Sequence, residues 1–168
     1  LHEKIEDATG QRVLERYGMT ETLMLVSNPH DGERRPGTVG FPLPGVELRL
    51  EGEPAEIQVR GPNVFDGYWE RPQANAEAFT ADGWFKTGDL GSKDSDGFIS
   101  IVGRAKELII SGGYNIYPRE VEDVLRKHSA IDDVAVVGES SDEWGERVIA
   151  YAVVSEPVRI QELREAIG

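Results

Sequence analysis

The stretch GFISIVGRAKELIISGGYNIYPREVE, residues 97–122, marks the point where the character of the chain changes. The apolar residues over 98–102 predict a strand that follows the turn DSDG and continues a strand-rich region. The two glycines of SGGYN predict a turn between two short extended segments. Pro118 then fits the first position of a helix over 118–128. This stretch therefore predicts that a strand-rich unit gives way to a smaller unit of mixed α+β structure.

Much of the chain before this stretch is expected to form strands. In VELRL (46–50) and EIQVR (56–60), apolar residues alternate with charged or polar ones. Such alternation is typical of half-buried antiparallel strands. The other expected elements are a helix over 1–9 that Gly10 ends, a strand over 12–16, a polar loop over 28–37 and a short helix that Pro72 opens.

The chain after this stretch predicts a small α+β unit. Apolar runs over 134–138 and 147–154 predict two strands, and IQELREAI, residues 160–167, predicts a helix. The apolar side of that helix has little to cover before the sequence stops. We therefore expect the last helix to be truncated and the sequence to be a fragment of a longer chain.

Composition limits the classes of function. The net charge of −13 repels phosphate backbones, so nucleic-acid binding is not expected. The sequence has no cysteine, which excludes disulfides and thiolate nucleophiles, and its three histidines are far apart, which predicts no histidine metal cluster. No apolar run approaches the roughly 20 residues that span a membrane, and the charges of LHEKIEDATG leave no apolar core for a signal peptide. We expect a cytoplasmic protein, although a mitochondrial matrix protein without its leader would have the same features.

The first motif with chemical potential is YGMTET, residues 17–22. Its glycine turn offers an aromatic face at Tyr17, a hydroxyl at Thr20 and a carboxylate at Glu21. These groups suit a nucleotide base, a phosphate oxygen and a hard cation, respectively. When this motif is taken alone, a capped turn without a ligand is the preferred interpretation. The motif indicates a nucleotide site only in combination with other motifs.

Three further motifs carry candidate binding residues. In KTGD, Asp89 follows a glycine bend and could accept two ribose hydroxyls, with a helix or turn cap as the alternative. In GRAKEL, Arg104 can fork to hydroxyl or phosphate oxygens, whereas the alternative for Arg104 and Lys106 is a solvated charge pair at a domain edge. In SGGYN, Gly112 and Gly113 form either a simple hairpin turn or a backbone that lies against a narrow ligand channel.

Together these motifs resemble, in order and spacing, the adenylate-forming acyl-CoA synthetases, the superfamily that also contains firefly luciferase and the adenylation domains of peptide synthetases. The resemblance extends across essentially all of the sequence and rests on ERYGMTET, AEIQVRGPNVFDGYW, GWFKTGDLG, GFISIVGRAKELIISGGYNIYPREVE and DEWGERVIA. Each stretch is a weak signal alone, and five in order are a strong one. Within the family, GERRPGTVGFPLPGVELRL beside ERYGMTET looks most similar to malonyl-CoA synthetases.

The resemblance implies an α/β (mixed α+β) fold. Residues 1–104 would be the C-terminal part of the large adenylate-forming domain, with a strand-rich, β-barrel-like subdomain, and residues 105–168 an incomplete small, mobile C-terminal domain. The implied enzyme is an ATP-dependent, AMP-forming acid–thiol ligase. It activates a carboxylic acid, here malonate or a related small acid, to an acyl-adenylate and then transfers the acyl group to coenzyme A. ATP, Mg²⁺ and coenzyme A are the implied cofactors.

The resemblance also implies roles for the residues of the first motif. Tyr17 would lie against adenine, and Gly18 and Met19 would belong to the same nucleotide-binding loop. Thr20 would bind phosphate, and Glu21 would hold Mg²⁺. Such chemistry needs charge neutralisation and positioning more than a covalent nucleophile.

The remaining implied roles belong to the later motifs. Asp89 would bind the ribose hydroxyls, and Arg104 would support the ribose or phosphate end. Lys106 would be the hinge on which the small domain turns. Gly112 and Gly113 would line the pantetheine passage. The expected catalytic set is Thr20, Glu21 and Lys106.

Two elements of the family do not occur in this sequence. The Gly/Ser/Thr-rich phosphate loop lies upstream of YGMTET, and the adenylation lysine follows in a Pro-x-x-x-x-Gly-Lys pattern that the sequence does not reach. We therefore expect these 168 residues to hold half of a nucleotide site and to be inactive alone. Two alternatives stay open: a non-catalytic module that binds nucleotide or coenzyme A, and a scaffold or interaction domain with relic motifs. The acid and the oligomeric state are open as well.

Overall fold

The computed structural model describes residues 2–161 and 163. The chain divides into two compact units, an N-terminal unit of residues 1–101 and a C-terminal unit of residues 102–168. The division lies close to the sequence-based boundary between residues 104 and 105. The assignment of the units to the large and small domains of an enzyme stays a prediction.

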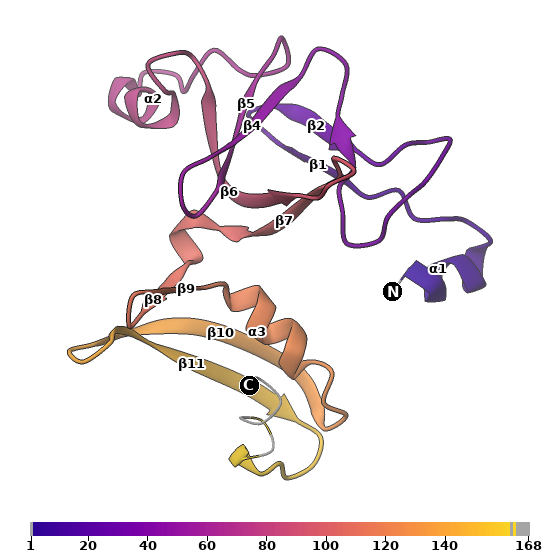
Figure 1. Cartoon of the computed structure of the whole chain (residues 1–168), viewed down its shortest axis with the longest axis vertical. Helices are drawn as coiled ribbons and strands as arrows, with labels where there is room; N and C mark the ends of the chain where they lie inside the picture. Colours follow the sequence, from indigo (N-terminus) through magenta and orange to yellow (C-terminus); the bar gives the residue numbers. More distant parts are fainter. Residues whose placement is uncertain (1, 162, 164–168) are drawn as a thin grey trace. The chain divides into compact units, whose positions relative to one another are not determined.

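The N-terminal unit is built mainly of strands (Figure 1). Its helices are α1 (His2–Thr9) and α2 (Pro72–Ala78). Its strands are β1 (Arg16–Met19), β2 (Leu23–Ser27), β3 (Phe41–Pro42), β4 (Glu47–Glu51), β5 (Glu56–Arg60), β6 (Phe85–Lys93) and β7 (Ile99–Arg104), of which β7 crosses the division between the units. Strands β1–β3 form one sheet, and β4–β7 form a second sheet in sequence order.

The expected barrel-like closure is not found among the described strands. One isolated bridge, between Gly40 and Ile99, joins the two sheets. The outer strands β1 and β4 are not neighbours in either sheet. A barrel needs continuous hydrogen bonding around its circumference, so the two sheets are better described as open.

The core of the N-terminal unit lies between these two sheets. The alternation in VELRL and EIQVR correctly predicted an antiparallel pair, in which Leu48 lies opposite Val59 and Leu50 opposite Ile57. Full burial of an aliphatic side chain stabilises a fold by roughly 1.5–3 kcal/mol, so a core shared by both sheets holds them together. Its buried members are Leu25, Val26, Ile57, Val59, Phe85 and Ile99.

Some local predictions for this unit are confirmed and one is wrong. The helix that Gly10 ends and the helix that Pro72 opens are both present, as α1 and α2. The strand expected over 12–16 is wrong, because the strand begins at Arg16 and includes the YGM of the first motif. Strands β2 and β6 were not anticipated.

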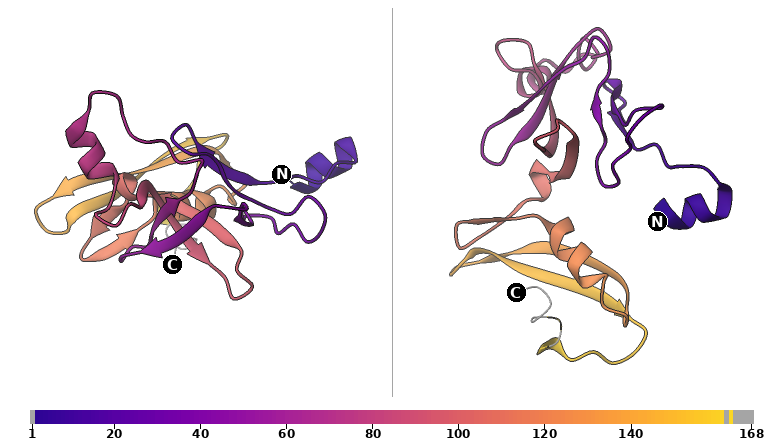
Figure 2. Two further views of the ribbon diagram at one scale, coloured as in Figure 1. Left: turned by 90° about the horizontal axis from the view of Figure 1, so that it is seen from above. Right: turned by 45° about the vertical axis from the view of Figure 1, so that its right-hand side comes forward.

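Among its described residues, the C-terminal unit contains a short 3₁₀ helix, η1 (Ala105–Glu107), and the α-helix α3 (Pro118–Leu125). Its strands are β8 (Ile109–Ser111), β9 (Tyr114–Ile116), β10 (Ile131–Ser141) and β11 (Gly145–Val154). They form one sheet in the order β10-β11-β8-β9, and α3 lies along one face of the long β10–β11 ribbon (Figure 2).

A second core lies between α3 and this sheet. Its buried members are Ile109, Leu125, Ile131, Val134 and Val136. The expected α+β unit with a Gly-Gly turn is therefore confirmed, although α3 ends at Leu125 rather than at 128. The helix expected over 160–167 lies largely outside the described residues. Within the part of the chain that the structure describes, no helix is long and apolar enough to cross a membrane.

Candidate functional site

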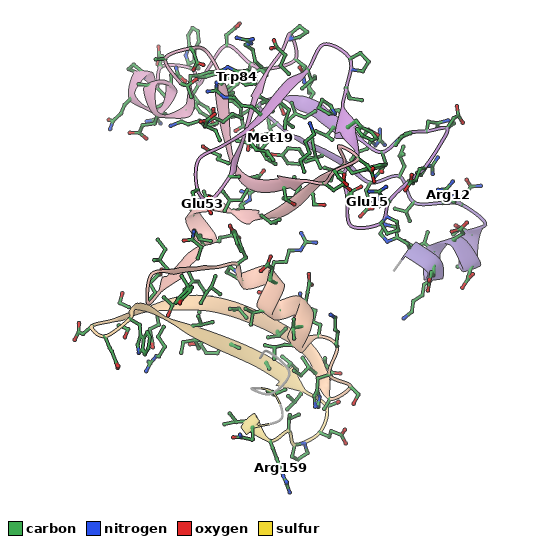
Figure 3. The ribbon with its side chains drawn as sticks, viewed as in Figure 1. Arg12, Glu15, Met19, Glu53, Trp84 and Arg159 are labelled. Atoms are coloured by element: carbon green, nitrogen blue, oxygen red, sulfur yellow. The ribbon has the colours of Figure 1, made fainter. Side chains whose placement is uncertain are left out.

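The first motif lies in the hairpin formed by β1 and β2. The register of this hairpin is irregular between Tyr17 and Gly18. A Cβ atom on Gly18 would lie 2.1 Å from the carbonyl oxygen of Leu23, far closer than any real contact. The close approach of the two strands therefore accounts for a glycine here without any ligand. Met19, labelled in Figure 3, packs against the core of the N-terminal unit, and the nucleotide roles of both residues stay predictions.

The second motif, KTGD, is neither a helix cap nor a turn cap but an irregularity inside β6. The Thr87 hydroxyl donates a hydrogen bond of 2.7 Å to the Ile57 carbonyl and accepts the Asp89 N–H at 3.1 Å. Gly88 has a φ of 73°, and its N–H donates to Glu56 Oε1 at 3.0 Å. A bulge re-aims a side chain where pairing is interrupted, and here it sets the direction of Asp89.

The bulge brings Asp89 to Tyr17. The Tyr17 hydroxyl donates a hydrogen bond of 2.6 Å to Asp89 Oδ2, across 72 residues of sequence. Asp89 is only 4 % exposed, and Tyr17 is half-buried. A buried carboxylate needs such a partner, because an unpaired one would lose its hydration without compensation. The structure thus places the aromatic ring of the first motif beside the carboxylate of the second.

Thr20 and Glu21 follow β1 in the turn, and Glu21 has a partner that the sequence analysis missed. Thr20 is exposed and Glu21 is half-buried. The Tyr68 hydroxyl donates a hydrogen bond of 3.0 Å to Glu21 Oε1. Burial and this hydrogen bond raise the pKa of Tyr68 above its ordinary value. Tyr68 lies in GPNVFDGYW, a stretch that contributes to the family resemblance but whose sequence does not indicate a contact with Glu21.

The candidate cation ligand can be compared with what Mg²⁺ requires. Within residues 2–161 and 163, no group of three or more His, Cys, Asp or Glu side chains is placed to hold a metal ion. Mg²⁺ that is bound with a nucleotide usually takes one or two carboxylates and completes its shell with phosphate oxygens and water. A single partly accessible carboxylate at Glu21, beside the exposed hydroxyl of Thr20, fits that limited role.

The other candidate residues lie near or within the C-terminal unit. Arg104 ends β7 and Lys106 lies in the middle of η1, both with exposed side chains. Gly112 and Gly113 have φ values of 57° and 83° and connect β8 to β9. Two consecutive positive φ angles are typical of a two-residue hairpin turn whose twist matches that of the flanking strands. The hairpin interpretation of SGGYN is therefore confirmed.

The glycine turn packs against a tryptophan from the last motif. The Gly112 N–H donates a hydrogen bond of 2.8 Å to the Trp144 carbonyl. A Cβ atom on Gly112 would lie 2.9 Å from the Trp144 ring. Close packing therefore explains the glycine at 112, and the predicted pantetheine passage remains to be tested. Trp144 was part of DEWGERVIA, but the sequence analysis assigned it no contact.

Comparison with known proteins covers both units. The family described as "AMP-binding enzyme" matches residues 1–69, and "AMP-binding enzyme C-terminal domain" matches residues 120–168. Together the two matches include more than half of the chain.

The chain belongs to the AMP-binding enzyme family. The sequence-based recognition of an adenylate-forming enzyme is thereby confirmed. Relatives of the chain in this family are named as CoA ligases. The chain is 45% identical over 159 residues to a long-chain-fatty-acid–CoA ligase of Salmonella typhimurium, covering 89% of this chain and 28% of the relative. It is 43% identical over 155 residues to a malonate–CoA ligase of Arabidopsis thaliana, covering 88% of this chain and 26% of the relative. It therefore spans little more than a quarter of the length of these two AMP-binding enzymes.

Solved structures of AMP-binding enzymes share the fold over nearly the whole chain. The crystal structure of ATP-bound MatB from Rhodopseudomonas palustris matches with a TM-score of 0.90 and 41% identity, covering 99% of this chain and 35% of that one. A malonyl-CoA ligase ternary product complex with methylmalonyl-CoA and AMP matches with a TM-score of 0.59 and 51% identity, covering 99% of this chain and 38% of that one. The expected mixed α/β fold is confirmed by these matches.

Proposed function

We propose that the natural protein containing this chain is an ATP-dependent, AMP-forming acid–thiol ligase. It activates a carboxylic acid to an acyl-adenylate with release of pyrophosphate, and then transfers the acyl group to coenzyme A with release of AMP. The observation that carries this proposal is the hydrogen bond between Tyr17 and Asp89, because it joins the two motifs expected to bind the two ends of adenosine. ATP-bound and coenzyme-A-product structures of family members are consistent with these ligands.

In the proposed site, Tyr17 and Asp89 bind the nucleoside. The hydrogen bond from the Tyr17 hydroxyl to Asp89 fixes the orientation of the Tyr17 ring. The face of the ring is thereby positioned to stack on adenine. The Asp89 carboxylate accepts ribose hydroxyls, since charge-assisted hydrogen bonds of this kind are strong. Gly18 and Met19 shape the same loop between these residues and the turn.

The turn after β1 would bind the other end of the nucleotide. The exposed Thr20 hydroxyl donates to a phosphate oxygen, and the Glu21 carboxylate is the ligand that this chain contributes to Mg²⁺. When bound, Mg²⁺ neutralises charge on the phosphates during adenylyl transfer. The protein groups themselves position the nucleotide, which is most of what such a transfer requires.

The C-terminal residues would serve the second half-reaction. We assign residues 1–104 to the C-terminal part of the large domain and residues 105–168 to the small mobile domain, in line with the two family matches. Arg104 supports the ribose or phosphate end, and Lys106 is the hinge. Gly112 and Gly113 line the pantetheine passage.

The substrate we propose is malonate or a related small acid. Identity alone does not decide this, because a long-chain-fatty-acid–CoA ligase and a malonate–CoA ligase are similar to the chain at 45% and 43%. The proposal rests on the likeness of GERRPGTVGFPLPGVELRL to malonyl-CoA synthetases and on the structural matches with MatB and a malonyl-CoA ligase.

A substrate panel tests this function. The purified natural protein would be incubated with ATP, Mg²⁺, coenzyme A and either malonate, methylmalonate or a long-chain fatty acid, while AMP and thioester are quantified. We expect both products with malonate or methylmalonate. Thioester from the fatty acid alone would refute the small-acid substrate. Tight AMP or coenzyme A binding without product from any acid would instead indicate a non-catalytic binding module. Cell fractionation tests the cytoplasmic location that belongs to the same proposal.

A further inference from the structure

Glu21 is held from two directions by one short segment of the N-terminal unit. The Phe65 N–H donates a hydrogen bond of 2.8 Å to the Glu21 carbonyl, and the Tyr68 hydroxyl donates one of 3.0 Å to Glu21 Oε1. The backbone and the side chain of Glu21 are thus both bound to the segment that precedes α2. A glutamate side chain in a half-buried turn can adopt several rotamers. The hydrogen bond from the Tyr68 hydroxyl favours the rotamer that places Oε1 beside it.

Tyr68 is itself fixed through its backbone by the side chain of Asn75, which lies in α2. The Tyr68 N–H donates to Asn75 Oδ1 at 2.7 Å, and Asn75 Nδ2 donates to the Tyr68 carbonyl at 3.0 Å. One amide therefore binds both polar backbone groups of Tyr68. Gly67 permits this approach, because its φ is +141° and a Cβ atom there would lie 2.9 Å from Asn75 Oδ1.

The Tyr68 ring is held as well. It meets the Phe65 ring edge-on, with the ring centroids 4.8 Å apart. Phe65 in turn contacts the rings of Phe79 and Phe85, with centroids 5.7 Å and 5.3 Å away, and Phe85 is a buried core residue. The hydroxyl that reaches Glu21 is therefore connected to the core by a rigid aromatic cluster, although Tyr68 is 37 % exposed.

We propose that Tyr68, fixed by Asn75, is a positioning residue that orients the Glu21 carboxylate for a divalent cation bound with ATP. This inference rests on the proposed function, in which Glu21 is the carboxylate ligand. Mg²⁺ demands near-ideal octahedral geometry, and groups that hydrogen-bond to a metal ligand commonly change metal affinity by 10- to 100-fold when they are removed. Tyr68 itself does not touch the reacting atoms.

The test compares metal binding and activity in the natural protein. Tyr68→Phe removes the hydroxyl and retains the ring packing. Tyr151→Phe is the matched control, because Tyr151 lies 65 % exposed on β11 and has no role in the proposed site. Mn²⁺ binding in the presence of ATP is measured by electron paramagnetic resonance, and the Mg²⁺ concentration for half-maximal pyrophosphate exchange is measured in parallel. We expect Tyr68→Phe to weaken Mn²⁺ binding and to raise the Mg²⁺ requirement by about 10-fold, with Tyr151→Phe unchanged.

A second variant separates positioning from folding. Asn75→Asp keeps the acceptor for the Tyr68 N–H and loses the donor to the Tyr68 carbonyl, so we expect a smaller shift in the same direction at a similar thermal midpoint. A lower thermal midpoint with unchanged Mn²⁺ affinity in both variants would overturn the inference. Tyr68 and Asn75 would then only stabilise the fold. ATP-independent Mn²⁺ binding by the unmodified protein would overturn it too. If the unmodified protein binds Mn²⁺ with ATP but forms no thioester with any acid, the proposed function fails while the metal-binding arm still decides the role of Tyr68.

Discussion

The Tyr17 hydroxyl and Asp89 Oδ2 are 2.6 Å apart, in a hydrogen bond that joins a hairpin strand to a bulge in the second sheet. The bond fixes an aromatic ring and a buried carboxylate in one rigid arrangement. A preformed arrangement binds a ligand with a smaller loss of side-chain entropy than a flexible one. The relationship between these two residues therefore leads directly to a test of nucleoside binding.

Asp89→Ala in the natural protein is expected to weaken AMP binding. Losing charge-assisted hydrogen bonds to ribose hydroxyls should reduce the binding free energy by on the order of 2–4 kcal/mol. Calorimetry with AMP measures the change. Tyr17→Phe serves as the comparison, because it leaves the carboxylate in place and should cost less. Equal AMP affinity in Asp89→Ala and the unmodified protein would show that Asp89 serves only to hold Tyr17.

Glu21→Gln is expected to raise the Mg²⁺ concentration that pyrophosphate exchange requires, because a neutral amide is a poorer ligand for a hard cation than a carboxylate. The exchange rate is followed as Mg²⁺ is varied at fixed ATP. Glu77→Gln, on the exposed side of α2, is the matched control. The same Mg²⁺ dependence in both variants would reduce Glu21 to a turn residue.

Lys106→Pro is expected to suppress one half-reaction while the other persists. Lys106 lies at the centre of the short 3₁₀ helix between β7 and β8, and hinges are commonly a few residues at the end of an element. Proline removes backbone freedom at 106 and restricts the preceding residue as well.

Pyrophosphate exchange and thioester formation from supplied acyl-adenylate would be assayed separately. Lys106→Ala is the control for the side chain, because it keeps the freedom of the backbone. Equal loss of both half-reactions in both variants, at normal thermal stability, would identify Lys106 as a direct ligand. Full retention of both in Lys106→Pro would exclude the hinge.

Glu47 supplies a prediction about pH. The Arg60 guanidinium donates two hydrogen bonds to Glu47, of 3.0 Å and 2.7 Å, and these hold the pKa of Glu47 below its ordinary value. Because the folded pKa is lower than the unfolded one, the contribution to stability is complete above the unfolded pKa of about 4.5 and is lost as the pH falls through the folded pKa.

Glu47→Gln should therefore slightly lower the free energy of unfolding at neutral pH and make it less sensitive to acid. The effect is small, because the pair is exposed. Denaturant midpoints measured from neutral pH to below the unfolded pKa would show it, with Glu77→Gln as the control. Parallel pH profiles for Glu47→Gln and the unmodified protein would contradict the prediction.

Local patterns were sufficient for part of the fold. The alternation in VELRL and EIQVR correctly identified two antiparallel strands, since both the buried face and the hairpin partner lie within a few residues. Gly10 and Pro72 marked helix ends for the same reason, because their backbone preferences act at one position.

The strands β2 and β6 escaped prediction because their patterns are irregular. In β2, Leu25 and Val26 are adjacent and both buried, which breaks the period of two. In β6, the Thr87–Asp89 bulge interrupts the pairing with β5. The strand expected over 12–16 is observed only from Arg16 onward. Each of these features depends on a neighbouring strand, which the local sequence does not specify.

By itself, the sequence determined the order of the motifs, the family and the kinds of functional group available at the candidate site. These properties are local, or depend only on spacing along the chain. The tertiary structure decided which groups meet: Tyr17 with Asp89 across 72 residues, and Tyr68 with Glu21 across 47. A hydrogen bond forms only within about 3 Å and with defined direction. Such precision between distant residues depends on sheet pairing, on a bulge and on an aromatic cluster, and these exist only once the chain has folded.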